Sequence, residues 1–337
     1  MPVRFHTVAK RLALLLAMVL VGDRALAWML ARAVSRTGTR FARAYRGGVD
    51  ADVLVVGDSR GVNGLYGPAI RDATGLSAFN LAYNGLSTHL CEALVLDYLE
   101  HNRAPRLLLV EASNVPSPDE MLDNLRLHWR DSARLDALAA ALIPRERRAT
   151  RILNLYGYDN ELALRSLFYA GRDDQDWVNR YRISPAVLEA ARREAPFRLE
   201  ARPDNLEALG RLVRAAEAKD IAVRVVLTPY LPDHLAKMQN WPEFVQAVEQ
   251  VVAPRKVWDY ADAIADTSMF ADRLHLNAEG ARRLARKMAA DGLFAVAAVA
   301  SNEPPAPASA QHSRFAGASA PSSEQDLRRH LRSTPGT

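Results

Sequence analysis

A serine near the start of the chain and a histidine near its end are the residues whose types could do chemistry together. Ser59 ends the sequence Gly57-Asp58-Ser59, directly after the apolar run Val53–Val56, and His275 ends Asp272-Arg273-Leu274-His275. A serine hydroxyl is a weak nucleophile at neutral pH and needs a general base that a third group orients. Because the ordinary pKa of histidine lies near neutrality, His275 is the natural base. Asp272 is the natural orienting group, so these residues predict attack on a carbonyl by Ser59.

The elements around the two motifs must bring them to one place. A continuous β-branched run such as Val53–Val56 is typical of a buried parallel strand, and ligands of open α/β sheets bind beyond the carboxyl ends of such strands. Asn277 is expected to cap a final helix that begins at Ala278. Further strands are predicted near 77–81, 106–111, 221–227 and 256–258, and helices over 90–101, 205–219 and 241–252. This alternation predicts a doubly wound parallel sheet.

The order of these motifs resembles that of the SGNH/GDSL hydrolase superfamily, which has a GDS block early in the domain and a DxxH block late. The resemblance covers residues 50–295 and implies an α/β fold, a three-layer α/β/α sandwich with a mostly parallel flavodoxin-like sheet. It also implies that Ser59, Asp272 and His275 are catalytic, and that no metal or organic cofactor takes part. Asp58 is expected to shape the turn by accepting backbone hydrogen bonds.

The same resemblance supplies an oxyanion hole. The second block of the family is a glycine that donates its backbone N–H, and Gly85 fits it here, with Ser59 as a further backbone donor. The third block is usually Gly-x-Asn-Asp after a strand, but this chain has Glu111-Ala112-Ser113-Asn114 at that place. Asn114 is therefore either an oxyanion donor or a loop residue, and Asn84 is an additional candidate donor.

Residues 115–200 interrupt the alternation of strands and helices. The segment is rich in arginine and holds Trp129 and Trp177, and it is predicted to be a helical insertion that could form a lid over the active site. Two interpretations remain open. Aromatic and arginine side chains could bind a sugar or an anionic polymer, or the helices could simply pack with a solvated charged face.

Residues 1–35 predict export or membrane attachment. Basic residues precede the uncharged apolar run Leu12–Gly22, which is how a signal peptide begins, and Ala25-Leu26-Ala27 resembles a cleavage site. The alternative is a membrane anchor that continues through Ala31 and includes the charged Asp23. Both interpretations place the domain in the cell envelope, on the periplasmic or extracytoplasmic side, and the second anchors it to the inner membrane. A third interpretation, an amphipathic helix of a cytoplasmic protein, also stays open.

Composition narrows the classes of function and of stabilising site that remain possible. The formal net charge is +5, and no basic stripe interleaves with aromatic residues, so nucleic-acid binding is not expected. No Cys/His cluster has the spacing of a zinc site. Cys91 is the single cysteine, so no intrachain disulfide can form, and it is expected to be buried. Residues 301–337 are rich in Pro, Ala and Ser and are predicted to be disordered.

The resemblance implies an esterase or O-acyltransferase that works through an acyl-enzyme. The N-terminal apolar segment, the unusual third block and the insertion resemble the cell-envelope branch, whose members add or remove O-acyl groups on exopolysaccharides or wall polymers. The implied substrate is an acyl ester or O-acylated carbohydrate. An alternative is a non-catalytic SGNH-like module that binds polysaccharide in an envelope assembly, and another is a membrane-anchored structural protein with a chance Gly-Asp-Ser.

Overall fold

A single five-stranded sheet organises the computed structural model, which describes residues 2–295. The predicted tail at 301–337 lies outside these residues. The strands are β1 (Val53–Val56), β2 (Ala78–Asn80), β3 (Leu107–Glu111), β4 (Ala222–Leu227) and β5 (Val257–Asp259). They lie in the order β2-β1-β3-β4-β5, and every neighbouring pair is parallel. This is the order of flavodoxin-like doubly wound sheets, and the predicted α/β class is confirmed.

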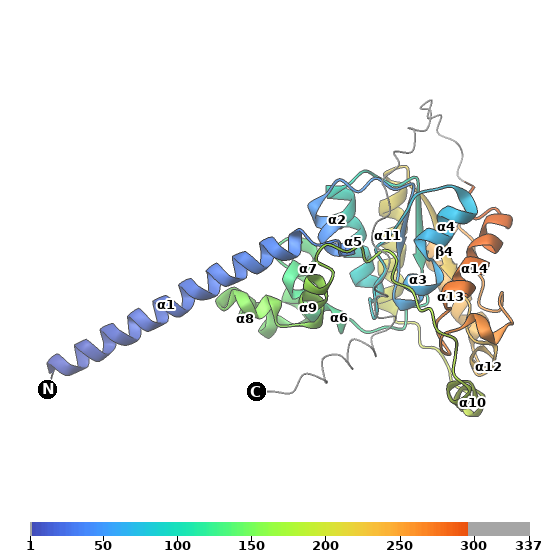
Figure 1. The fold of residues 1–337 in the computed structure, drawn as a ribbon. Coiled ribbons are helices and arrows are strands. Elements are labelled where there is room, and N and C mark those ends of the chain that lie inside the picture. Colours follow the sequence, from blue (N-terminus) through green and yellow to red (C-terminus); the bar gives the residue numbers. More distant parts are fainter. Residues whose placement is uncertain (1, 296–337) are drawn as a thin grey trace.

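Helices cover both faces of the sheet and complete three layers (Figure 1). Alternate residues of β1 face opposite sides, so that Leu54 and Val56 belong to one core cluster while Val53 and Val55 belong to the other. The first face packs against α2 (Arg40–Arg46), α5 (Thr88–His101), α11 (Pro203–Glu217) and α13 (Trp241–Val252). The second packs against α4 (Gly67–Thr74) and α14 (Ala278–Ala290). Burial on both faces explains why the strands are continuous apolar runs.

The predicted insertion is helical and lies between β3 and α11. It contains α6 (Met121–Asn124), η1 (Leu125–His128), α7 (Ala133–Leu142), α8 (Pro144–Ile152), η2 (Asn154–Tyr158), α9 (Glu161–Phe168) and α10 (Pro185–Arg193). Its parts lie in different places (Figure 1): α7 to α9 gather beside the N-terminal helix, whereas α10 packs against the short helix α12 (Pro232–Leu235). The insertion is therefore not one compact lid.

The N-terminal helix α1 (Pro2–Ser35) projects from the body, and only its C-terminal part docks on it (Figure 1). Within the described residues, it is the one helix long and apolar enough to cross a membrane, with a mean hydropathy of 1.8. Asp23, Ala27 and Val34 are buried, and their spacing puts them on one face of the helix. The Asp23 carboxylate accepts hydrogen bonds from the backbone N–H groups of Asn154 (2.8 Å) and Leu155 (2.9 Å), and thereby caps η2.

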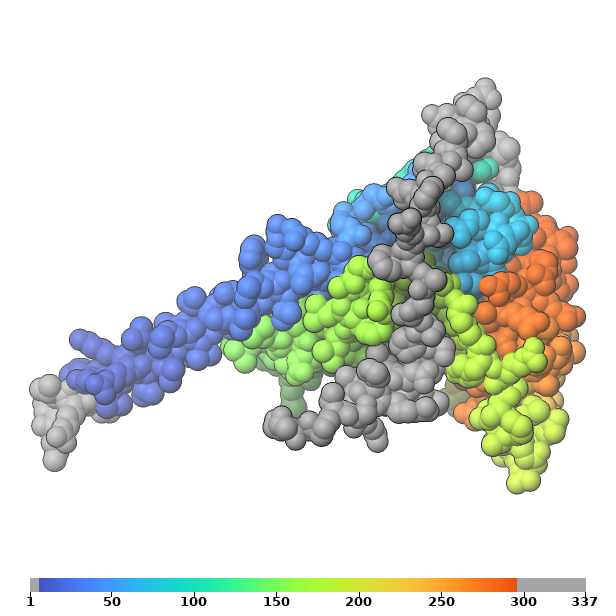
Figure 2. All heavy atoms as spheres, in the orientation of Figure 1, coloured from blue at the N-terminus to red at the C-terminus, as the bar shows by residue number. Residues whose placement is uncertain are grey.

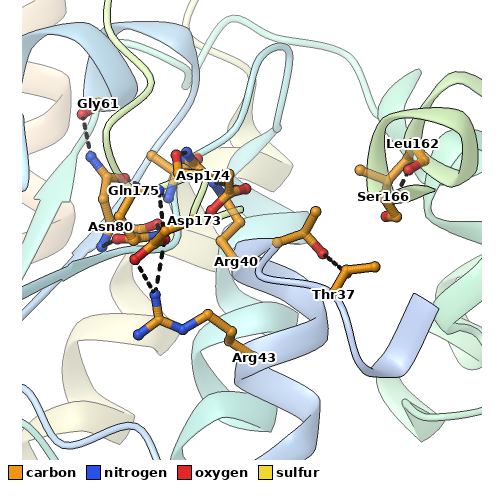
Figure 3. Close-up of polar contacts among 12 residues, drawn as sticks. Thr37, Arg40, Arg43, Gly61, Asn80, Leu162, Ser166, Asp173, Asp174 and Gln175 are labelled. Atoms are coloured by element: carbon orange, nitrogen blue, oxygen red, sulfur yellow. Dashed lines mark hydrogen bonds and ion pairs between the residues drawn. The ribbon is translucent and has the colours of Figure 1, made fainter. Parts of the chain in front are cut away.

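A polar network ties the chain after α1 to the sheet (Figure 3). Arg40 of α2 donates to Asp174 at 3.1 Å in an ion pair whose side chains are both 2% exposed, and it also donates to the carbonyl of Ala82. Gln175 exchanges hydrogen bonds with the backbone of Asn80 at the end of β2. The end of the insertion and the start of the domain are thus joined beside the segment that carries the predicted oxyanion glycine.

Candidate active site

Ser59 lies at the carboxyl end of β1, as the first residue of α3 (Ser59–Gly64). The carboxylate of Asp58 accepts a hydrogen bond from the backbone N–H of Arg60 at 2.8 Å, so the prediction that Asp58 shapes the turn is confirmed. Gly57 has a φ of +150°, and a Cβ built there would lie 2.7 Å from the Cβ of Glu111. Only glycine fits this close approach, which sets the direction in which the chain leaves the strand toward Ser59.

The structure brings the three predicted catalytic residues together. His275 Nε2 lies 2.7 Å from Ser59 Oγ, and His275 Nδ1 lies 2.8 Å from Asp272 Oδ2. The Asp272 carboxylate also accepts from the backbone N–H groups of Leu274 (2.7 Å) and His275 (2.9 Å). The loop between η3 (Thr267–Met269) and α14 thus holds its own carboxylate against the histidine ring. Asn277 caps α14 as predicted, because its side chain accepts from the backbone N–H groups of Glu279 and Gly280.

The electrostatics of this group favour a charged carboxylate beside a histidine that can accept a proton. Burial alone would raise the pKa of Asp272. The hydrogen bond and charge of His275, together with the two loop N–H groups, outweigh burial and hold this pKa below its ordinary value. The His275 side chain is 18% exposed and that of Asp272 34%, so the group is sheltered but open to a substrate. A hydroxyl, a base and an orienting carboxylate in this order can carry out acyl transfer.

The segment that holds Gly85 lies beside the serine turn. The backbone N–H of Tyr83 donates to the carbonyl of Gly57 at 3.2 Å. Gly85 has a φ of +71°, which favours glycine, and it is exposed. Within residues 2–295, neither its backbone N–H nor that of Ser59 donates a hydrogen bond to the protein. Both groups are free to donate to a substrate oxygen.

Asn114 does not occupy the role of an oxyanion donor. Its side-chain amide donates to the carbonyl of Leu86 at 3.0 Å and to Cys91 Sγ at 3.3 Å, and its Oδ1 accepts from Thr88. These bonds use both amide hydrogens, and the residue is 1% exposed. Of the two alternatives left open for Asn114, these contacts favour the loop residue, which holds the segment that follows Gly85. Cys91 is buried, as predicted.

The side chain of Asn84, unlike that of Asn114, is not held by hydrogen bonds to any described residue. Its Oδ1 is buried and has no hydrogen-bond partner within the described part of the chain. It lies between Tyr83, which is bonded to the serine turn, and the exposed Gly85. Buried polar atoms are rarely left unpaired, and the side-chain amide of Asn84 thus differs from that of Asn114 in being unused by the described part of the protein.

Arg60 and Glu111 form a buried ion pair next to the serine turn. The sequence motifs did not predict this pair. Arg60 is 5% exposed and donates to the carbonyls of Leu274 (2.8 Å) and Thr228, and its Nε lies 3.6 Å from Glu111 Oε1. Glu111 is fully buried at the end of β3. Burial raises the pKa of both Asp58 and Glu111, while the positive charge of Arg60 opposes that rise. Arg60 therefore fastens the histidine loop to the helix that carries Ser59.

The sequence contained one indication of this buried ion pair. Glu111 is the one charged residue of an otherwise apolar strand that is buried throughout. Charged residues are almost never fully buried unless they are paired. A glutamate at the carboxyl end of such a strand predicts a cationic partner at the sheet edge, but it does not say which arginine supplies it.

His234 of α12 is buried and faces the end of the insertion. It is 4% exposed, and its Nδ1 lies 2.5 Å from Glu194 Oε2, just beyond α10. Burial lowers the pKa of His234, although Glu194 opposes this. Beside this pair lies a shallow hollow of about 480 Å³, formed by α10 and by residues 272–274 of the histidine loop. The end of the insertion thus borders the predicted site.

Residues 2–295 contain no cluster of three or more His, Cys, Asp or Glu side chains that could hold a metal ion. No protein-family model matches the chain, and no curated protein matches it in sequence.

Proposed function

We propose that this protein is a serine-dependent esterase or O-acyltransferase of the SGNH/GDSL type. The observation that carries the proposal is the pair of hydrogen bonds that link Ser59 to His275 and His275 to Asp272, at 2.7 and 2.8 Å. The flavodoxin-like strand order supports it, because Ser59 lies at the carboxyl edge of the sheet, where ligands of such folds bind.

In the proposed reaction, Ser59 Oγ attacks the ester carbonyl carbon while His275 Nε2 takes the hydroxyl proton. Asp272 stabilises the imidazolium, and the backbone N–H groups of Ser59 and Gly85 hold the oxyanion. The tetrahedral intermediate collapses, the C–O bond to the alcohol breaks, and the alcohol leaves with the proton from Nε2. Water or a sugar hydroxyl then attacks the acyl-enzyme through the same base, which gives hydrolysis or transfer.

We assign the third oxyanion donor to Asn84. Asn114 has no free amide hydrogen, whereas the side-chain amide of Asn84, next to Gly85, makes no hydrogen bond within residues 2–295, so that its Nδ2 can donate to the oxyanion. A donor that forms its bond only when the oxyanion is present stabilises the transition state selectively.

The proposed location is extracytoplasmic, with α1 as an uncleaved membrane anchor. Asp23, Ala27 and Val34 are buried on the body, and Asp23 caps η2. Removal of the chain up to Ala27 would expose the face that these residues cover. An O-acylated envelope carbohydrate is the proposed substrate. An alkaline phosphatase fused to the C-terminus should be active, and intact-mass analysis of the purified protein should find α1 present; an inactive, stable fusion or a start at Trp28 contradicts the assignment.

A non-catalytic polysaccharide-binding module is the second candidate function. It is favoured by one observation, namely that Asn114 is committed to the protein and leaves a conventional third donor missing. In that case Ser59 would not become acylated.

The deciding experiment is labelling of the purified full chain in detergent with a fluorophosphonate, together with hydrolysis of p-nitrophenyl acetate. Wild type should label and hydrolyse the ester, Ser59→Ala should do neither, and His275→Ala should lose nearly all labelling. Ser184→Ala is the matched control, because Ser184 is the N-cap of α10 and its hydroxyl accepts from the backbone N–H of Val187 rather than bonding to His275. Wild type that fails to label beside a known serine esterase supports the binding module, and labelling that survives in Ser59→Ala refutes the site.

A further inference from the structure

A second cavity lies where α1 meets the insertion. Its volume is about 870 Å³, and it is lined by the C-terminal part of α1, by α2 and by the segment from η1 to η2. In Figure 2 the insertion lies directly against α1 near the point where the helix leaves the body. This cavity shares no lining residue with the triad.

The cavity is strongly basic. Arg24 and Arg32 line it from α1, Arg36 lines it from the turn after α1, and Arg126, Arg130 and Arg151 line it from the insertion. The acidic lining residues are Asp131 and Asp136, and Asp136 is already paired with Arg147 (2.6 Å) and Arg151 (2.9 Å). Neither Arg32 nor Arg36 forms an ion pair with any described residue. The surplus of guanidinium groups favours an anionic ligand.

Three lining side chains carry buried nitrogens that lack a hydrogen-bond partner in the described part of the chain. They are Arg126 Nη1, His128 Nε2 and Trp129 Nε1, on residues that are 7%, 3% and 4% exposed. The arginine and tryptophan nitrogens can only donate, and the histidine nitrogen donates when the ring is protonated. Leaving such groups buried and unpaired is unfavourable, because they have lost their hydrogen bonds to water. A ligand with several oxygen acceptors, such as a phosphate, would satisfy them.

The surroundings place this cavity at a membrane surface. The uncharged run Leu12–Gly22 of α1 is mostly exposed and ends just before Arg24, the first lining residue. Trp28 lines the cavity and is 64% exposed, as is typical of aromatic residues at the headgroup level. The insertion beside α1 also exposes apolar side chains on α7 to α9, namely Leu142, Ile152, Leu153, Leu164, Leu167 and Phe168. These face no core and would lie against lipid.

We propose that this cavity binds the phosphate headgroup of an anionic lipid, with the acyl chains along the exposed apolar surface of α1. The inference rests on the proposed membrane anchoring by α1, but not on catalysis. Headgroup binding would satisfy the buried nitrogens and would fix the orientation of the body on the membrane. In this proposal, the part of the insertion from α7 to α9 contacts the membrane and does not cover the active site.

The test is native mass spectrometry of the full-length Ser59→Ala protein in nonionic detergent. It is titrated separately with dioleoyl phosphatidylglycerol, dioleoyl phosphatidylcholine, inorganic phosphate and an acidic polysaccharide. Phosphatidylglycerol should bind in a discrete stoichiometry and more tightly than phosphatidylcholine. Because a basic residue near an anionic surface is worth about 1 kcal/mol, Arg32→Gln/Arg36→Gln should weaken phosphatidylglycerol binding about tenfold or more.

Two further variants keep the result interpretable. Trp129→Phe removes one buried donor but keeps a ring, and it should also weaken phosphatidylglycerol binding. Arg148→Gln is the matched control, since Arg148 is an exposed arginine of α8 that does not line the cavity. The same substitutions are also made in the protein that keeps Ser59. Its labelling by the fluorophosphonate shows whether each variant is folded.

The alternative outcomes are distinct. Equal binding of the two lipids, or binding unchanged in Arg32→Gln/Arg36→Gln, overturns the proposal. Saturation by inorganic phosphate or the acidic polysaccharide without lipid preference identifies a free-anion or polymer site and also overturns it. Failure of the protein to float with liposomes refutes the anchor, whereas loss of labelling in wild type refutes the enzyme and leaves lipid binding untouched.

Discussion

The sheet edge and the α1–insertion junction are both rich in polar side chains, but they satisfy them differently. At the sheet edge, Ser59, His275 and Asp272 are bonded to one another, and Arg60 bonds to loop carbonyls. At the junction, Arg126, His128 and Trp129 leave buried nitrogens unpaired. In the proposed reaction, the first arrangement would hold the serine hydroxyl in place before substrate arrives. The second has hydrogen-bonding nitrogens that the described part of the protein does not pair.

This contrast suggests two kinds of function. Proton transfer between a nucleophile and a base requires side chains that are already held at hydrogen-bond distance, because this geometry must exist before the transition state forms. A binding site can leave its donors open, because the ligand completes them. The sheet edge also contains one open element, the Asn84–Gly85 segment, at the place where charge would develop. The following predictions test whether the two regions differ as described.

The largest expected effect is that of Asp272→Asn on activity. The amide cannot stabilise the imidazolium and would favour the wrong ring tautomer, so kcat/KM for p-nitrophenyl acetate should fall about 10⁴-fold. Asp266→Asn is the control, because Asp266 caps η3 in the same loop without touching His275. Activity close to that of wild type in Asp272→Asn would show that the sheet edge is not a prearranged relay.

Arg60→Met should have the largest effect on stability. It leaves Glu111 buried without its cation, so the free energy of unfolding should fall by about 3–5 kcal/mol. Chemical denaturation followed by tryptophan fluorescence measures this change. The double variant Arg60→Met/Glu111→Gln should recover part of the loss, because the buried charge is removed while the amide oxygen still accepts from one of the two hydroxyls, that of Ser113 or that of Thr228. A double variant as unstable as the single one would argue against the ion pair.

The two asparagines should separate into catalytic and structural roles. Asn84→Ala should lower kcat about 10²–10³-fold at nearly constant KM, since an oxyanion donor is worth about 2.7–4 kcal/mol. Asn114→Ala should instead lower the free energy of unfolding by about 1–3 kcal/mol, because the carbonyl of Leu86 loses its donor. Steady-state kinetics and denaturation of both variants give the answer. The opposite pattern would restore Asn114 as the donor.

The smallest expected effect is at the junction. Asp23→Ala removes the cap of η2 and should cost about 0.5–2 kcal/mol of stability, with activity unchanged. Asp23→Asn keeps a capping oxygen and should behave nearly as wild type. Protease sensitivity of the segment 143–160, followed by mass spectrometry, reports local opening. Identical digestion of Asp23→Ala and wild type would mean that α1 does not support the insertion.

The regular part of the fold was readable in the sequence because its signals are local. The run Val53–Val56 and the helix 241–252 carry periodicities that fix the type of element without knowledge of their neighbours. Gly57-Asp58-Ser59 and Asp272–His275 were equally visible, since the turn and the loop are each built from adjacent residues.

The residues whose roles depend on distant partners were misjudged or missed. Asn114 was weighed as a donor because its place after a strand fits, but its amide is used by Leu86 and Cys91, which are far away in sequence. The burial of His234 likewise depends on a distant segment, because its ring bonds to Glu194 of the insertion. Asp23 seemed to be a charge within a span, although it caps a helix more than a hundred residues further along the chain.

The sequence by itself determined the parallel α/β class, the nucleophile motif and the acid–base motif, because each of these is encoded in neighbouring residues. Only the tertiary structure decided which groups remain free to act. A hydrogen-bond donor can be used once, and whether Asn114, Asn84 or Arg126 is already engaged depends on contacts between segments that no local pattern describes.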